Sequence, residues 1–459
     1  MEITKIMSLT SDQIHGFIKD HKIKVAIIGI GRIGLPTAIS FANSGLETIG
    51  VDINKNLVEK INQQIFPLED EPGMKEIFEH VISNKKLSAT TNIKDALSQV
   101  DVVILSLPTP MNNENIPDYS ALELVAQDLN NFLLPNSLVV VESTVEPGFV
   151  ENIFIPIIEG KDKKFEAGKS FGIGVCPETA NPGEILKDFK ILPRLVGGIN
   201  EKSSQIISSI YDHVFHVDLI QMPDCKTANA VKLTTNVFRD INIAFVNELS
   251  LLFEKLDIDI FTVLDAAKTK YNFQVHYPGC GVGGPCLPVN SYQIINSARP
   301  FPSNLTRLIS TAREINEQMP FHTIDLLKDA LKSGGQAIED STIGILGVSY
   351  KPNVKDIQLS PSEQIISKLK SLGCKIKIYD PYFISSNVFT INTENTSEDA
   401  IKNSDAILVL TAHKEFFSIN PEIFSRFMKK PIVVDTRGIF DPSELNKLKI
   451  IYRGIGRPN

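Results

Sequence analysis

Apolar runs of strand length recur through the first half of the chain, and segments of helical period separate them. Each run is apolar at consecutive positions rather than at alternate ones, which is typical of strands in a parallel sheet covered on both faces. This alternation predicts an α/β domain that ends near residue 215. The predicted strands are 24–30, 47–53, 100–107, 137–143, 172–178 and a last strand near 214–219.

The middle of the chain has a different pattern. Residues 224–255 have helical period and contain neither Gly nor Pro, and a second helical stretch covers 304–331. Between them, the loop 277–290 is the densest cluster of Gly and Pro in the chain. These features predict a mostly helical middle domain built on one long central helix.

A second β-α alternation follows the polar segment 333–340 and predicts another α/β domain. We therefore expect two doubly wound parallel-sheet domains joined by the helical middle domain, with a cleft between the sheets where two nucleotides can face each other. Residues 1–22 resemble an amphipathic helical extension, so the folded body is expected to begin at Ile23. The predicted division is 1–22 (extension), 23–215 (first sheet domain), 216–332 (helical middle) and 333–459 (C-terminal domain).

Composition and charge narrow the class of protein without changing this picture. The 459 residues carry a net charge of -8, which argues against nucleic acid or an anionic membrane surface as a partner. No apolar run approaches the ~20 residues of a membrane span, and the N-terminus does not resemble a secretory signal, so we expect a soluble cytoplasmic protein. The cysteines are scattered without a CxxC pair, which favours reduced thiols over disulfides or a zinc site, and no metal is expected. They are Cys176, Cys225, Cys280, Cys286 and Cys374.

A dinucleotide fingerprint follows the first predicted strand. Gly29, Gly31 and Gly34 form GxGxxG at the start of a predicted helix, and Asp52 ends the next strand. The glycines permit a tight turn and close approach of the backbone to a pyrophosphate, while the acid accepts hydrogen bonds from the adenosine ribose. In this strand-turn-helix-strand context the motif predicts a Rossmann-like domain that binds a dinucleotide.

Asp52 also favours NAD over NADP, because a carboxylate there repels a 2'-phosphate and no Arg follows it. Lys55 is the one nearby residue that softens this preference. Arg32, within the turn, has two interpretations that the sequence leaves open: a contact to the pyrophosphate or a solvated surface side chain.

The chemistry is predicted from Cys286, which lies among glycines and prolines in GVGGPCLPVN. Structural cysteines usually lie in regular apolar helices or strands, so this thiol is a candidate covalent nucleophile for a carbonyl. Lys232 and Asn236 are one turn apart on the long helix, in apolar surroundings. An ammonium and an amide on one helix face can together stabilise an oxyanion or hold a water molecule.

Several motifs occur together in a characteristic order: GIGRIGLP, STVEPG, CPETANPG, PRLVGG, NAVKLTTNVFRDINIAFVNEL, GVGGPCLPVN and LGVSYKPNVKD. In order and spacing they resemble those of the UDP-glucose/GDP-mannose dehydrogenase family, from Ile23 to the end of the chain. The resemblance implies an NAD-binding Rossmann domain, a helical middle whose long helix forms the dimer contact of a homodimer or higher homo-oligomer, and a Rossmann-like C-terminal domain that binds a UDP-sugar. It implies NAD-dependent oxidation of the sugar C6 hydroxyl to a carboxylate through a thiohemiacetal and a thioester.

The resemblance also assigns roles. Cys286 resembles the nucleophile, Lys232 and Asn236 the groups that stabilise oxyanions and position water, Glu178 the general base for hydrolysis, and Thr144 a residue near the nicotinamide. The expected substrate contacts are Arg239, Gly279, Gly281, Gly283, Gly284 and Lys351. The expected cofactor contacts are Gly29, Gly31, Arg32, Ile33, Gly34, Asp52, Thr109 and Thr144.

Three positions depart from the family pattern. Asn290 stands where many relatives have Asp near the thiol, so a charge that controls the thiol and its water is lost. Gln358 replaces an Arg directed toward the cofactor, and Pro285 replaces a His frequent in the N-acetylhexosamine branch. With the nucleophile, the lysine and the fingerprint all present, we still expect an active enzyme, and we include Asn290 among its catalytic residues.

The motif PETANPG resembles the form found in dehydrogenases of UDP-N-acetylmannosamine and UDP-N-acetylglucosamine, and this favours a UDP-N-acetylhexosamine as substrate. Thr179, in place of the usual Arg, keeps UDP-glucose as an alternative. Two other hypotheses remain: a two-electron β-hydroxyacid dehydrogenase, which would need neither the cysteine loop nor a second α/β domain, and a catalytically idle nucleotide-sugar-binding protein.

Overall fold

The computed structural model describes residues 6–302 and 304–458. The chain divides after Thr235 into two compact units, and Tyr292–Pro300 belongs to the first of them. Two helices contribute to both units: α10 (Cys225–Lys255) and α12 (Leu287–Ser297). The fold class predicted from the sequence, two Rossmann-like sheet domains and a helical middle, is confirmed.

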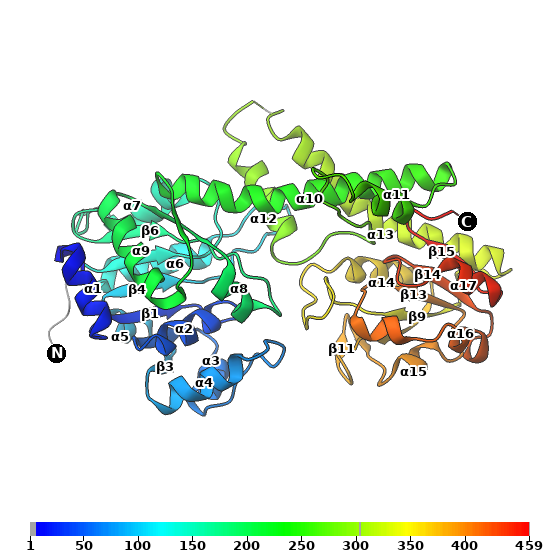
Figure 1. The fold of residues 1–459 in the computed structure, drawn as a ribbon, viewed down its shortest axis with the longest axis horizontal. Helices are drawn as coiled ribbons and strands as arrows, with labels where there is room; N and C mark the ends of the chain where they lie inside the picture. Colours follow the sequence, from blue (N-terminus) through cyan, green and yellow to red (C-terminus); the bar gives the residue numbers. More distant parts are fainter. Residues whose placement is uncertain (1–5, 303, 459) are drawn as a thin grey trace. The chain divides into compact units, whose positions relative to one another are not determined.

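The first unit is built on an eight-stranded sheet in the order β3-β2-β1-β4-β5-β6-β7-β8 (Figure 1). Neighbouring strands are parallel except β6 and β7, which are antiparallel. The strands are β1 (Lys24–Ile28), β2 (Glu47–Val51), β3 (Leu87–Thr90), β4 (Val102–Leu105), β5 (Leu138–Val141), β6 (Gly172–Val175), β7 (Arg194–Gly198) and β8 (Leu219–Gln221). The sequence patterns did not predict β3 or β7. The strand expected near 214–219 begins only at Leu219, as β8, because α9 continues to Phe215.

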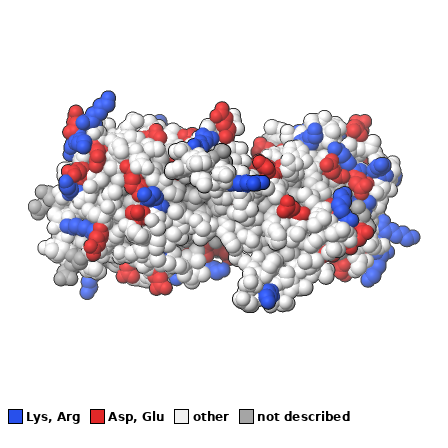
Figure 2. Space-filling view, turned by 90° about the horizontal axis from the view of Figure 1, so that it is seen from above, with Lys and Arg blue, Asp and Glu red and all other residues white. Residues whose placement is uncertain are grey.

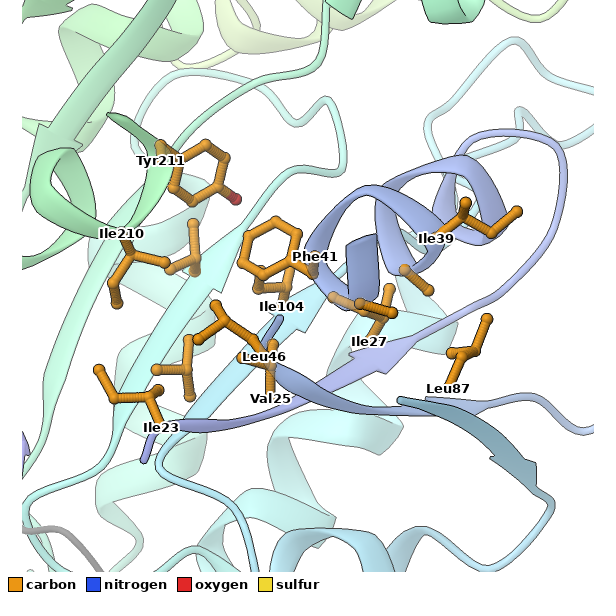
Figure 3. Packing of buried hydrophobic residues seen from close by; sticks show 14 of the residues in the cluster. Ile23, Val25, Ile27, Ile39, Phe41, Leu46, Leu87, Ile104, Ile210 and Tyr211 are labelled. Carbon is orange, nitrogen blue, oxygen red and sulfur yellow. The ribbon is translucent and has the colours of Figure 1, made fainter. Parts of the chain in front are cut away.

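Helices cover both faces of this sheet, which explains its continuous apolar strands. The side chains of β1 point alternately into two hydrophobic cores, one on each face of the sheet. Val25 and Ile27 belong to the first core, and Ala26 and Ile28 belong to the other. Figure 3 shows Val25, Ile27 and Phe41 of α2 within the same cluster of buried side chains. The helices are η1 (Ile6–Ser8), α1 (Ser11–Lys19), α2 (Gly34–Asn43), α3 (Lys55–Asn62), α4 (Met74–Ser83), α5 (Ile93–Leu97), α6 (Ser120–Phe132), η2 (Val150–Phe154), α7 (Ile155–Glu159), α8 (Ile185–Ile191) and α9 (Glu201–Phe215).

The N-terminal segment is part of the first core. Ile6, Ile14 and Ile18 are buried among its residues, α1 packs on α9, and the Met7 amide donates to the Asn136 carbonyl at 3.0 Å. Among the described residues, the core therefore already includes side chains that precede Ile23, where the sequence analysis expected the folded body to begin. Helical amphipathicity showed that the segment has an apolar face, but not which surface covers that face.

The second unit carries an all-parallel sheet in the order β10-β9-β13-β14-β15. Long helix α13 (Arg307–Ser333) packs along β14 and β15 on one face (Figure 1). The strands are β9 (Thr342–Leu346), β10 (Lys375–Tyr379), β11 (Asn387–Val388), β12 (Ile391–Asn392), β13 (Ala406–Val409), β14 (Ile432–Asp435) and β15 (Ile451–Gly454). The other helices are α11 (Ile260–Ala267), α14 (Pro361–Ser371), α15 (Ser397–Ile401), η3 (Lys414–Ser418), α16 (Glu422–Phe427) and α17 (Pro442–Lys447).

On the face seen in Figure 2, Lys and Arg side chains are interspersed with Asp and Glu. This face therefore carries no broad field of one sign that would attract an anionic ligand. In the described part of the chain, no helix is long and apolar enough to cross a membrane.

Candidate functional site

The turn between β1 and α2 gives its three glycines separate tasks. Gly29 has a φ of +87°, and a Cβ there would lie 2.6 Å from the Ser106 carbonyl oxygen. A Cβ on Gly34 would lie 1.8 Å from the Gly29 carbonyl oxygen, so this glycine lets the helix begin against the strand. A Cβ on Gly31 would meet nothing within 4 Å. Protein packing does not require a glycine at 31, whereas the close approach of a pyrophosphate does, so the turn fits the predicted dinucleotide.

Asp52 follows β2 and binds the same turn. Its Oδ2 accepts the Ile30 amide at 3.1 Å, and its Oδ1 accepts the Asn54 amide at 2.9 Å. The carboxylate is thus held at the carboxyl end of the strands, where a ribose lies in dinucleotide-binding sheets. Ile33 directly precedes α2 in this turn.

Arg32 was interpreted from the sequence either as a contact to the pyrophosphate or as a solvated surface side chain, and the structure shows a third arrangement. Its Nη2 lies 2.6 Å from Asp70 Oδ2 and 3.2 Å from Glu71 Oε1, so the guanidinium is ion-paired within the protein. Burial raises the pKa of Glu71, and the amides of Gly183 and Ile185 donate to the same carboxylate. These partners are distant in sequence, which is why the local pattern could not predict them.

Thr109 and Thr144 come together where β4 and β5 end. The Thr144 carbonyl oxygen accepts from Thr109 Oγ1 and from Gln293 Nε2, each at 2.9 Å. Gln293 is fully buried on α12, in the part of that helix that belongs to the first unit. It was not among the predicted residues, because nothing near it in sequence marks it.

Glu178 is held by the first unit on both of its oxygens. Oε1 accepts the amides of Thr179 and Ala180 at 2.7 and 2.8 Å, and Oε2 lies 2.9 Å from Nη1 of buried Arg194. A general base needs a lone pair directed at water. The structure instead places this carboxylate in an ion pair, and its role as a base stays a prediction.

A second carboxyl group, Glu142, shares this buried cluster and was missed by the sequence analysis. Tyr211 Oη donates to Glu142 Oε1 at 2.6 Å, and Arg194 Nη1 is 4.0 Å from the same oxygen. Desolvation, together with the nearby charge of Glu178, raises the pKa of Glu142 to about 7. Figure 3 shows Tyr211 extending from its helix toward the core.

We expect Glu142→Gln to stabilise the protein at pH 8. The pKa of Glu142 is raised from 4.5 to about 7 on folding, so the folded state binds the proton more tightly and stability falls as pH rises through that window. The glutamine keeps an acceptor for Tyr211 but carries no charge, and should add up to about 3 kcal/mol to the free energy of unfolding at pH 8. Urea unfolding at pH 5 and pH 8 measures this, with Glu59→Gln, at an exposed position of α3, as control. An equal change at both pH values would contradict it.

Cys286 caps the N-terminus of α12. Its carbonyl oxygen accepts the Asn290 amide at 2.8 Å, the first bond of the helix, and its side chain is exposed whereas the other four cysteines are buried. A helix N-terminus favours an anion, as a thiolate is. Local context in the sequence had singled out the same cysteine.

Asn290 and Asn236, both predicted, are brought together. Asn236 Nδ2 donates to Asn290 Oδ1 at 2.5 Å, and both side chains are buried. An aspartate at 290 would accept the same bond, so the departure from the family pattern keeps this contact and removes the charge. Lys232, one turn earlier on α10, is also buried, whereas Arg239 is exposed.

The glycines of the Cys286 loop face protein. A Cβ on Gly279 would lie 2.1 Å from Arg437 Nη1, one on Gly283 2.4 Å from the Leu359 carbonyl oxygen, and one on Gly284 2.5 Å from the Tyr350 ring. Gly281, with a φ of +129°, sits over Pro361 in the same way. The sequence analysis expected these glycines to wrap a ligand. The structure shows that they let the loop pack on the C-terminal sheet domain, so contact with substrate by their backbone stays a prediction.

Lys351 is half-buried in the segment that follows β9. Asp380 Oδ2 accepts the amides of Val348 and Ser349 at 2.8 and 3.2 Å, and fully buried His413 accepts the Asn353 amide at 3.0 Å.

The Gln358 carbonyl oxygen accepts the Gly284 amide at 3.0 Å. The backbone at 358 therefore supports the Cys286 loop whichever side chain is present there.

Known protein families and proteins are similar to this chain over most of its length. Three models of the UDP-glucose/GDP-mannose dehydrogenase family match: its NAD binding domain over residues 23–215, its central domain over 226–318 and its UDP binding domain over 344–442. A UDP-N-acetyl-D-mannosamine dehydrogenase from Pyrococcus horikoshii is 33% identical over 434 residues, which are 95% of this chain and 99% of that protein.

Two solved structures have the same fold over nearly their whole length. The UDP-D-ManNAc dehydrogenase from Pyrococcus horikoshii has a TM-score of 0.87 at 32% identity, covering 95% of this chain and 99% of that one. An NDP-N-acetyl-D-galactosaminuronic acid dehydrogenase from Methanosarcina mazei has a TM-score of 0.81 at 28% identity, covering 96% and 98%.

Proposed function

Because the chain belongs to the UDP-glucose/GDP-mannose dehydrogenase family of NAD-dependent nucleotide-sugar dehydrogenases, we propose that its substrate is a UDP-N-acetylhexosamine, first of all UDP-N-acetylmannosamine. The product is the uronate, formed by four-electron oxidation at C6. The observation that carries the proposal is the near-complete match to a relative named for UDP-N-acetyl-D-mannosamine, together with an exposed Cys286 at a helix N-terminus.

The chain's own residues supply covalent chemistry between the two oxidations. The glycine turn would hold NAD, which would supply the acceptor for one hydride in each of the two oxidations. The Cys286 sulfur adds to the C6 aldehyde, forming a C–S bond while the carbonyl oxygen takes up a proton. Removal of hydride and of that proton leaves a thioester. Water then attacks the acyl carbon, the C–S bond breaks, and the carboxylate and the Cys286 thiol are released.

We assign stabilisation of the oxygen at C6 to Asn236 and Lys232. The Asn236 amide carries two N–H groups and gives one to Asn290. The second is available in this proposal to the oxygen that becomes negative when sulfur or water adds. Lys232 adds a positive charge one turn along α10.

Counting NADH against a panel of sugars tests reaction class and substrate together. The panel is UDP-N-acetylmannosamine, UDP-N-acetylglucosamine, UDP-N-acetylgalactosamine and UDP-glucose. We expect two NADH and one uronate per UDP-N-acetylmannosamine. Preference for UDP-glucose would support the alternative substrate, and one NADH with an aldehyde or ketone product would favour a two-electron dehydrogenase. Binding of NAD and UDP-sugar without any turnover would favour an idle binding protein.

We also propose that the protein is a homodimer. Phe238, Phe245 and Leu252 recur every seven residues on α10 and are 46–51% exposed, so they form an apolar stripe on one side of the helix. Burial of this stripe against a second copy would remove it from water. Light scattering should give a mass near twice 50.8 kDa for the wild-type protein and near 50.8 kDa for Phe245→Asp. A monomeric wild-type protein would overturn this proposal.

A further inference from the structure

A buried polar cluster in the second unit lies outside the residues that have been assigned a role. Its centre is Asp240 on α10, whose side chain has no exposed surface. The other members are Asn247, Ser291, Arg313 and Asn316, each at most 4% exposed. We infer that Asp240 is a positioning residue that fixes both ends of the Cys286 loop, an inference that rests on the proposed role of Cys286 as nucleophile.

Both oxygens of Asp240 are engaged. Oδ2 accepts from Ser291 Oγ at 2.7 Å, while Oδ1 accepts from Arg313 Nη1 at 2.9 Å and Asn316 Nδ2 at 2.8 Å. The carboxylate can only accept, and the guanidinium can only donate. Arg313 supplies the opposite charge that a fully buried carboxylate needs.

The direction of these bonds continues to the start of the loop. Because Asn316 donates its Nδ2 to Asp240, its Oδ1 is directed toward Asn247 and accepts Asn247 Nδ2 at 2.9 Å. Asn247 is thereby oriented with Oδ1 toward the loop, where it accepts the Gly279 amide at 3.0 Å. The carboxylate of Asp240 thus sets the orientation of two amides and, through them, an acceptor for Gly279.

The end of the loop is held from the same helix face. Ser291 lies on α12, five residues after Cys286, and bonds Asp240 directly. One turn earlier on α10, Asn236 bonds Asn290. Positions 236, 240 and 247 fall on one side of a helix. The segment from Gly279 to Ser291, which comprises the loop and the start of α12, is therefore tied to that side of α10 at its beginning and at its end, with Cys286 between the two ties.

Stability alone does not require such a cluster, since apolar residues of similar volume often replace a buried ion pair without loss. A connected polar network does specify one arrangement, because its donors and acceptors must all be paired at once. Reaction at C6 needs that specificity, since the sulfur must meet the aldehyde carbon along a narrow approach.

The first test severs α12 from Asp240. Ser291→Ala removes one hydroxyl and leaves Asp240 paired with Arg313 and Asn316. We expect kcat for carboxylate formation to fall about tenfold while KM for NAD is unchanged, because the thiol is misplaced and the glycine turn is not. Ser250→Ala is the matched control, since Ser250 is equally buried on α10 but bonds only the Val246 carbonyl of its own helix among the contacts described. Its kcat should stay within twofold of wild type.

The second test needs no turnover. Asn247→Ala removes the acceptor of the Gly279 amide, and hydrogen exchange of residues 279–291 should become about tenfold faster in the full-length protein while Ser250→Ala exchanges as wild type. If Ser291→Ala keeps wild-type kcat, or if Ser250→Ala loses as much, the inference is overturned. Unchanged exchange in Asn247→Ala overturns it too. If the wild-type protein oxidises no UDP-sugar, the proposed function fails, and the exchange comparison still decides whether the hydrogen-bond network that includes Asp240 holds the loop.

Discussion

Carboxylate formation is expected to fall by roughly 10³-fold or more when Cys286 is replaced by Ser, with NAD and UDP-sugar still bound. Serine is a favoured N-cap residue, so α12 and the loop should keep their structure. Its hydroxyl is a far weaker nucleophile at neutral pH than a thiol, so the aldehyde is not captured. Mass spectrometry of the product measures uronate directly, and calorimetry measures the two dissociation constants.

Cys374→Ser is the control for this substitution. Its sulfur donates to the Ile338 carbonyl oxygen at 3.3 Å within the hydrophobic core of the second unit, and a hydroxyl can make the same bond. We expect this variant to keep its rate. Undiminished uronate production by Cys286→Ser would contradict the covalent mechanism, whereas loss of ligand binding would show that the cysteine has a structural task instead.

Substitutions at Gly31 and Gly34 should separate cofactor binding from folding. Gly31→Ala puts a methyl group into space that the protein leaves open, so the thermal midpoint should not change. The same methyl group obstructs the approach of the pyrophosphate, and a clash of about 1–3 kcal/mol corresponds to roughly 5- to 150-fold weaker NAD binding. Titration calorimetry and thermal unfolding measure the two effects on one sample.

Gly34→Ala should destabilise the folded protein itself rather than only weaken its binding of NAD. Its Cβ would lie 1.8 Å from the Gly29 carbonyl oxygen, which is backbone and cannot rotate away. We expect a loss of at least about 3 kcal/mol in the free energy of unfolding, or no folded protein. Equal stability of the Gly34→Ala and wild-type proteins would show that the turn can relax, and unchanged NAD affinity in Gly31→Ala would place the cofactor elsewhere.

Features that depend on local spacing were predictable. The GxGxxG turn, the continuous apolar strands and the 31-residue α10 all follow from residue type and period along a short window. Cys286 stood out for the same reason, because its glycine and proline neighbours exclude a regular element on its N-terminal side.

Features that depend on distant partners were not predictable. Nothing near Gly279 indicates that Arg437 will cover it, and nothing near Glu178 indicates a shared arginine at 194. A glycine needed for packing and one needed for a ligand look alike in sequence. The role of Asp240 could not be predicted because its partners Arg313 and Asn316 are more than seventy residues away in the sequence.

The packing of the N-terminal segment has a practical consequence for anyone who produces this protein. Shortening the chain to Ile23 removes Ile6, Ile14 and Ile18 from the first core and leaves the outer side of α9 uncovered. Such a truncated chain would expose an apolar surface to water, and we expect it to aggregate when it is expressed. A purification tag should therefore not replace this segment.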